Sequence, residues 1–436
     1  MAIKSYYETQ YGLKGNPFPS QATYGEDSKI AYVPEMFGPQ RPEFLRKFIL
    51  APLENGQPLI GAVWSITTGD PAARGFGKST LMAEESKQIS SDFGKSTLLS
   101  LGVSEEDAQA NPVLAGYVSF NVKGYGGISS VDAAAFNLSR FILRIRDEQG
   151  ISTHTKIRER AVARLVSEGR AVSGNETPAI VAAVRESFQK LAVTIDIRNI
   201  LEDYLYHLAS PDTNALERFL TSEVGTWHHD RNGLKYLQIL VVLADLAGIE
   251  HFTFFIDQVE DFTYIAGPSK IQKNVKIIRD ALIEAEPFST KASFVFQLHP
   301  AAYYRLKDAW KHEDLPSLFY DDPLNESTVI VLRGLKEFDS ARLLAGGILN
   351  HPAVVLPTRK DGISPFTESS LKTVWEATKP NPRDYLRTLN RLLELGSKQK
   401  IPTLDDSFVS TKLEHLTVSS SEGETTVETG IDERTT

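Results

Sequence analysis

The sequence predicts an α/β fold in which helices cover both faces of a parallel sheet, followed by a small all-helical domain. Three observations predict it. Five short runs of apolar and β-branched residues recur between residues 59 and 333. Helical patterns separate these runs, and strands that alternate with helices typically form a parallel sheet. After Arg333 the apolar residues recur at helical spacing alone.

The predicted strands are short, and the connections between them differ greatly in length. The five runs are residues 59–68, 114–122, 252–257, 292–298 and 328–333. A helix is expected from about Lys78, and residues 131–146 place their apolar side chains on one helix face. Helical patterns then fill residues 150–250, which is more than one crossover requires. We therefore expect a helical insertion at about residues 150–230.

Four regions follow from these patterns. Residues 1–54 form a lead-in rich in aromatic residues, Gly and Pro, and residues 55–334 form the core. Residues 335–400 form the helical domain, in which Asn381 is the expected N-cap of a helix that begins with Pro382. Residues 401–436 carry eight acidic side chains against two basic ones and are expected to be largely disordered.

Composition narrows the class of protein. A chain of 436 residues suggests two or three domains, and 41% hydrophobic with 24% charged residues is typical of globular proteins. There is no cysteine, which excludes disulfides, zinc–thiolate sites and thiol nucleophiles. The first twenty residues lack the apolar stretch of a signal peptide, so a cytoplasmic location without membrane contact is expected. Residues 1–400 have a net charge of only −3, which does not favour constitutive DNA binding.

The strongest motif is "TTGDPAARGFGKSTL", residues 67–81, between the first strand and the following helix. In this context Gly75, Gly77 and the amides up to Thr80 would wrap phosphates, while Lys78 would reach the β- and γ-phosphates. The Ser79 hydroxyl would be a Mg²⁺ ligand. The usual spacing GxxxxGK[ST] needs Gly at position 72, where this chain has Ala, so the loop would be about three residues longer. The alternative is a Gly-rich turn that contains Lys-Ser-Thr by chance.

Two further segments bear on this motif. In "HFTFFIDQVEDF", Asp257 ends an apolar strand and could hold Mg²⁺ opposite the loop; alone, such a strand is common. The letters "FGKST" recur at residues 93–97, but no strand precedes them, so Lys95 is assigned no nucleotide role.

Together these motifs resemble a P-loop NTPase, and within that class the ATPases of the AAA+/STAND kind. "YGLKGNPF" at residues 11–18 is similar to the lead-in of ExeA- and TniB-type ATPases. The resemblance implies ATP and Mg²⁺ as cofactors and a helical lid. It also implies that Glu260, with Gln258 where many members have Glu, orients water. Gln297 or His299 would be the first sensor, and Arg383 would be the second.

We therefore expect an ATPase that acts as a nucleotide-driven conformational switch on macromolecular partners, either as a homo-oligomer or with a partner protein. One alternative is a nucleotide-gated scaffold with little turnover. Another is a DNA-associated ATPase of the initiator or transposition-regulator kind. For that one, the arginines of residues 157–170 either contact phosphates or lie on a solvated helix face.

Overall fold

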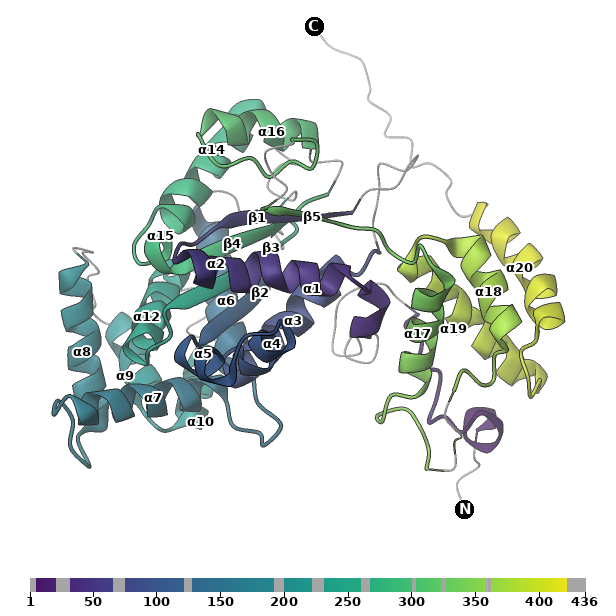
Figure 1. Ribbon diagram of the computed structural model, residues 1–436, viewed down its shortest axis with the longest axis horizontal. Coiled ribbons are helices and arrows are strands. Elements are labelled where there is room, and N and C mark those ends of the chain that lie inside the picture. The colour runs from purple at the N-terminus through teal and green to yellow at the C-terminus, as the bar shows by residue number, and fades with distance from the viewer. Residues whose placement is uncertain are drawn as a thin grey trace, which may run out of the picture. The chain divides into compact units, whose positions relative to one another are not determined.

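The computed structural model divides the chain into two compact units. Residues 38–333 form one, here called the sheet unit, and residues 1–37 with 334–436 form the other, here called the helical unit (Figure 1). The structure describes residues 5–20, 32–65, 75–120, 128–191, 200–221, 231–259, 267–299, 303–322, 327–357, 359 and 362–421.

The sheet unit contains one five-stranded parallel sheet, as the sequence predicts. Its strands are β1 (Ile60–Ser65), β2 (Val113–Ser119), β3 (His251–Asp257), β4 (Ala292–Gln297) and β5 (Val329–Leu332). The order across the sheet is β2-β3-β4-β1-β5, and every neighbouring pair is parallel. Because all the strands run in the same direction, their carboxyl ends lie along the same end of the sheet.

Helices precede and connect the strands. In chain order they are α1 (Gln40–Leu45), η4 (Arg46–Leu50), α2 (Ala51–Asn55), α3 (Lys78–Asp92), α4 (Lys95–Ser100), α5 (Glu105–Ala110), α6 (Ile128–Arg144), α7 (Thr153–Ser167), α8 (Glu176–Lys190), α9 (Ile200–Ala209), α10 (Thr213–Thr221), α12 (Gly233–Leu246), α14 (Pro268–Ile278), η6 (Arg279–Ile283), α15 (Phe288–Lys291) and α16 (Tyr303–His312). Among the described residues, none of these helices is long and apolar enough to cross a membrane.

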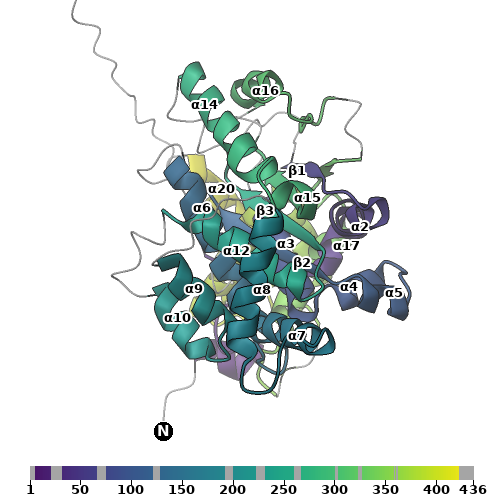
Figure 2. The same cartoon turned by 90° about the vertical axis from the view of Figure 1, so that its left-hand side faces the viewer.

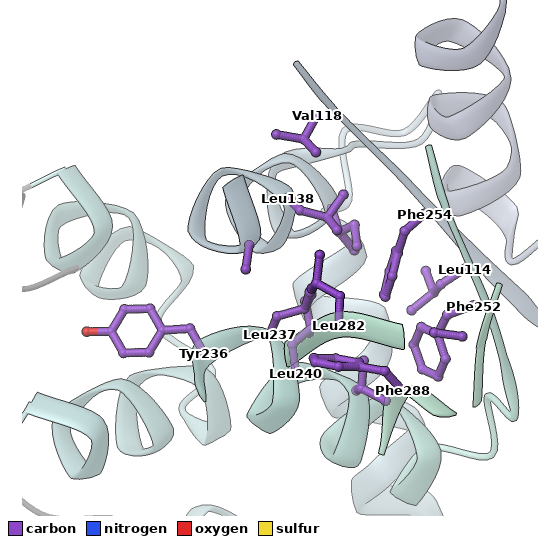
Figure 3. Packing of buried hydrophobic residues seen from close by; sticks show 14 of the residues in the cluster. Leu114, Val118, Leu138, Tyr236, Leu237, Leu240, Phe252, Phe254, Leu282 and Phe288 are labelled. Atoms are coloured by element: carbon purple, nitrogen blue, oxygen red, sulfur yellow. The ribbon is translucent and has the colours of Figure 1, made fainter. Parts of the chain in front are cut away.

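Both faces of the sheet are covered, because successive side chains of a strand point to opposite faces. On one face the Phe254 ring packs against Phe288 and Phe294. The same face meets leucines of α12 such as Leu237 and Leu240 (Figure 3). On the other face the Phe255 ring stacks on Phe44 of α1, with 5.2 Å between the ring centroids. The segment α1–η4–α2, predicted to be an irregular lead-in, is thus helical and part of the sheet unit.

Side chains close both edges of the sheet, where unpaired backbone groups would otherwise invite another strand. At the β2 edge the Ser90 hydroxyl donates to the carbonyl of Ala115 and accepts from its amide. At the β5 edge the Gln40 amide donates to the Val331 carbonyl and accepts from the Arg333 amide. At each edge, one side chain thus satisfies backbone groups that have no neighbouring strand.

Where the sequence suggests a helical insertion, the chain forms α7 to α10, which pack with one another and on α12 (Figure 2). Its arginines have structural partners within the chain. Arg158 donates to the carbonyl of Ala209, which ends α9, and Arg160 donates to that of Ala247, which caps α12. Arg164 donates to the Asp245 carbonyl. Cations at helix C-termini are favourable, so these contacts stabilise the insertion.

The helical unit contains η1 (Tyr7–Tyr11), η3 (Pro34–Phe37), α17 (Phe338–Leu349), α18 (Glu368–Thr378), α19 (Pro382–Gln399) and α20 (Asp406–Ser421). The "YGLKGNPF" segment belongs to this unit, where the Tyr11 hydroxyl donates to the Ile401 carbonyl. The Asn16 side chain donates to the carbonyl of Asn390 on α19, and the Asn390 side chain donates to the carbonyl of Phe18. The division at residues 37 and 333 thus differs from the predicted boundary at residue 54.

The predicted acidic tail also contains structure. Its residues 406–421 form α20, and Leu404 and Val409 are buried. Val409 anchors α20, which packs on α18, while Leu404 packs before the helix beside Gly396 of α19. Residues 422–436, which hold most of the tail's acidic side chains, lie outside the described residues.

At the junction of α6 with the start of α12, two backbones approach each other closely. A Cβ on Gly233 would lie 1.7 Å from the backbone oxygen of Asp132. The Asp132 carboxylate in turn accepts from the Leu234 amide at 3.1 Å, at the N-terminus of α12. Burial raises the pKa of Asp132 to about 6, although the hydrogen bond from Leu234 and the charge of Lys235 lower it.

We expect Gly233→Ala to destabilise the sheet unit by at least about 3 kcal/mol, since two backbones must separate to admit a methyl group. Gly346→Ala in α17 is the matched control, because the nearest atom to its Cβ would be 3.7 Å away. Helix propensity makes that control neutral or slightly stabilising. Urea unfolding followed by circular dichroism measures both, and equal midpoints for the two variants would contradict the close approach.

We expect Asp132→Asn to stabilise the protein at pH 8 but not at pH 4. The raised pKa means that the carboxyl contributes most stability below its unfolded pKa, and that this contribution is lost as the pH rises through about 6. Asn keeps the acceptor for Leu234 without the buried charge. Partial exposure of Asp132 limits the gain at pH 8 to about 1 kcal/mol. Urea midpoints at the two pH values test this; an equal gain at both would refute it.

Candidate functional site

The carboxyl ends of β1, β3 and β4 bring polar side chains from distant parts of the chain together. Ser65 ends β1, Asp257 ends β3 and Gln297 ends β4. Ile256 pairs with Phe296, so the ends of β3 and β4 are level, and Val63 pairs with Gln297, so β1 continues two residues further to Ser65. Helix α3 begins at the same edge with Lys78 and Ser79, which contact this group. We call Ser65, Lys78, Ser79, Asp257 and Gln297 the strand-end cluster.

Two glycines shape the entry into α3. Gly75 has φ 86° and Gly77 has φ 80°, backbone conformations that L-residues with side chains rarely adopt. Gly77 is the N-cap and has no side chain to accept from the first amides of the helix. The amides of the first helical turn, which include those of Lys78, Ser79 and Thr80, have no acceptor inside the helix and attract anions. Residues 66–74, the first part of the predicted loop, lie outside the described residues.

Lys78 is the cation of the cluster, and only 6% of it is exposed. Its ammonium donates to the Ser65 hydroxyl at 2.5 Å. It also lies close enough to Asp257 to lower the pKa of that carboxyl. A buried ammonium without compensating charge is unfavourable, and Asp257 is an opposite charge near it at the end of the sheet.

Ser79 lies between two acceptors from different strands. Its hydroxyl contacts the Gln297 amide oxygen at 3.3 Å, and a hydrogen bond from Ser79 also lowers the pKa of Asp257. A hydroxyl and a carboxylate are oxygen ligands of the kind that Mg²⁺ prefers. Among the described ranges, no three His, Asp or Glu side chains gather into a metal-binding group. Mg²⁺ commonly binds through one or two protein ligands plus phosphate and water oxygens, so Ser79 and Asp257 fit it.

Asp257 is the acid of the cluster, and only 1% of it is exposed. Burial raises the pKa of its carboxyl. Three donors lower the pKa again: the Ser79 hydroxyl, the Tyr117 hydroxyl at 2.8 Å and the backbone amide of Gln258 at 2.7 Å. Three donors and a nearby ammonium satisfy the buried carboxyl and partly offset the effect of burial, which still leaves its pKa above the usual value.

Gln258 turns the chain away from β3. Its φ is 60°, a left-handed conformation that is uncommon outside glycine, and its side chain is exposed. The Ser119 hydroxyl at the end of β2 donates to the Gln258 amide oxygen at 2.8 Å. That contact leaves the amide NH₂ as a donor toward solvent. Glu260, the predicted water-orienting acid, lies outside the described residues.

The remaining predicted residues lie in two places. His299, two residues beyond β4, is 6% exposed. Arg383 lies in the first turn of α19, where the Asn381 side chain accepts from its amide at 3.0 Å, so Asn381 and Pro382 begin the helix as predicted. Arg383 belongs to the helical unit, and its approach to a nucleotide stays a prediction.

The second "FGKST" has a different environment. Gly94 again has a positive φ, 79°, and Lys95 again begins a helix, α4. The Lys95 ammonium, however, pairs with Glu105 on α5 at 2.7 Å, and the two side chains are 38% and 69% exposed. Phe93 lies under the Arg160 guanidinium, 5.4 Å from its ring centroid. The repeat therefore serves the packing of α3 and α4 against the insertion.

Sequence reasoning missed two members of this site. Ser65 could have been found, because it ends the strand that leads into the glycine-rich loop. Tyr117 could not, because a tyrosine inside the apolar run "LAGYVSF" has the pattern of a core aromatic residue. Its hydroxyl reaches Asp257 only because β2 pairs with β3.

Comparison with protein-family models and with curated protein sequences found no match to this chain. The functional assignment therefore depends on the residues of the strand-end cluster and on their geometry.

Proposed function

We propose that this chain is an ATP-binding ATPase of the AAA+/STAND kind that acts as a nucleotide-driven conformational switch on macromolecular partners. The observation that supports it most is the meeting of the start of α3 with three strand ends: Lys78 donates to Ser65 of β1, and Ser79 contacts Gln297 of β4 and hydrogen-bonds Asp257 of β3. A five-stranded parallel sheet of this order is consistent with a P-loop fold but is not specific to it. The strand-end cluster is what supports the narrower proposal.

The phosphate end of the site would be formed by α3. Gly75 and Gly77 let the backbone turn closely around an anion, and the first amides of α3 are donors for phosphate oxygens. Lys78 would exchange its contact with Ser65 for phosphate oxygens. Its buried stem supports this role, because a charge held out of water interacts more strongly with an anion than an exposed one does.

Ser79 and Asp257 would hold Mg²⁺. When bound, the ion would neutralise phosphate charge and orient the terminal phosphate for attack. The chain's own contribution is to present a hydroxyl and a charged carboxylate at one point.

The residues for hydrolysis are less complete than those for binding. Gln258 is an amide and cannot accept a proton as Glu would, so it can only orient water. Gln297, next to Ser79, is the polar residue suited to sense the terminal phosphate. Glu260 follows Asp257 by three residues in the sequence and is the acid that would activate water. In this proposal turnover is slow unless Glu260 takes part.

The helical unit would be the lid. Arg383, at the start of α19, would sense the phosphates, and the resulting change in the lid would be read by other copies of the chain or by a partner protein. The same features allow a second function, a nucleotide-gated scaffold with little turnover, which Gln258 in place of Glu favours. The DNA-associated alternative gains no support, because Arg158, Arg160 and Arg164 donate to carbonyls within the chain.

We expect Lys78→Ala to weaken ATP binding at least about 100-fold, the effect of losing a buried charged contact worth about 3 kcal/mol. Lys95→Ala is the matched control, because the same pentapeptide surrounds it but its ammonium pairs with Glu105 at the surface. Titration with a fluorescent ATP analogue measures both. Equal affinities of Lys78→Ala and the native protein would remove the nucleotide site from α3.

We expect Glu260→Gln to retain ATP binding and to slow steady-state phosphate release at least about tenfold, since it removes the acid available to activate water. Gln258→Ala should slow release less, because an amide only orients. Release measured with and without DNA also tests the DNA alternative. Release that is negligible in the native protein would favour the scaffold; a loss confined to Gln258→Ala would mean that Glu260 has no role.

A further inference from the structure

We propose that Tyr117 is a positioning residue that holds the Asp257 carboxylate ready for the divalent cation. Tyr117 has this role only if the proposed function holds, because Asp257 is then the metal-binding carboxylate. The phenol itself would contact neither the cation nor the nucleotide.

The geometry puts Tyr117 beside Asp257 by way of the sheet. Tyr117 lies on β2 and pairs with Phe255 of β3, two residues before Asp257. Its hydroxyl donates to Oδ2 of Asp257 at 2.8 Å. The two residues are 7% and 1% exposed, so water competes little for this bond. The edge of the Phe141 ring, on α6, supports the tyrosine ring with 6.0 Å between centroids.

Both carboxylate oxygens are thereby oriented. The backbone amide of Gln258 donates to Oδ1 of Asp257 at 2.7 Å, while the Tyr117 hydroxyl donates to Oδ2. A carboxylate has about four lone-pair sites, so each oxygen retains acceptor capacity for a ligand. A carboxylate that is already oriented need not reorganise when a cation binds, which favours binding.

A phenol suits this position better than a cation would. A hydrogen bond from a neutral donor stabilises a buried carboxylate without adding positive charge. A lysine or arginine at position 117 would also orient Asp257, but its charge would repel Mg²⁺. The chain already has one ammonium near Asp257, that of Lys78.

The experiment compares Tyr117→Phe with Tyr204→Phe. Tyr204 is a matched control, because it is fully buried on α9 and its hydroxyl has no hydrogen-bond partner in the described part of the chain. Binding of a fluorescent ATP analogue is measured without metal and then as a function of Mg²⁺ concentration. For Tyr117→Phe we expect unchanged metal-free affinity and an increase of about tenfold in the Mg²⁺ concentration at half-saturation. Tyr204→Phe should match the native protein in both.

The outcomes separate the two proposals. If the native protein binds no nucleotide, the proposed function fails. If it binds in a Mg²⁺-dependent way and Tyr117→Phe has the same Mg²⁺ requirement, the role of Tyr117 is refuted while the proposed function stands. If the circular dichroism of Tyr117→Phe shows that this variant does not fold, the Mg²⁺ requirement of Phe141→Leu is measured instead. That variant keeps the hydroxyl but loosens the ring, so the Mg²⁺ requirement should rise less, and an unchanged requirement would overturn the role.

Discussion

The parallel pairing of β1, β3 and β4 is the constraint on which the strand-end cluster depends. Residues that are far apart in sequence meet only because this parallel pairing brings the carboxyl ends of the three strands to the same side of the sheet. The pairing in turn depends on covering both faces: Phe254 needs the leucines of α12, and Phe255 needs the segment around Phe44. A sheet uncovered on either face would expose rows of phenylalanine, and the cluster would lose its frame.

Burial makes the cluster chemically useful and also costly. A carboxylate and an ammonium at the end of a sheet lose most of their hydration, which each would avoid by becoming neutral. The structure supplies compensation from four elements: β2 through Tyr117, β3 through the Gln258 amide, α3 through Ser79 and Lys78, and β1 through Ser65. This network counters the effect of burial on the Asp257 carboxyl without overcoming it, since its pKa stays above the usual value.

Strand and helix patterns predicted the sheet because they depend on local periodicity. All five strands and the helical insertion were predicted, with ends shifted by a few residues. The predicted boundary at residue 54 differs from the division at residue 37 in the structure. Residues 40–55 contain aromatic residues and Pro, which suggested an irregular segment, yet they form helices because Phe44 and Phe48 find a sheet face to cover. Tyr11 and its neighbours pack with α19 and Ile401, a long-range choice without local signature.

The two copies of "FGKST" separate what sequence determines from what tertiary structure decides. In both, the glycine adopts a left-handed φ, 80° at Gly77 and 79° at Gly94, and the lysine begins a helix. Those features are local, so identical letters produce them twice. The environments differ: Lys78 is buried against Ser65 at the end of β1, whereas Lys95 pairs with Glu105 at the surface. Whether a lysine can serve a phosphate depends on which strand ends lie beside it, and only the packing of the whole sheet decides that.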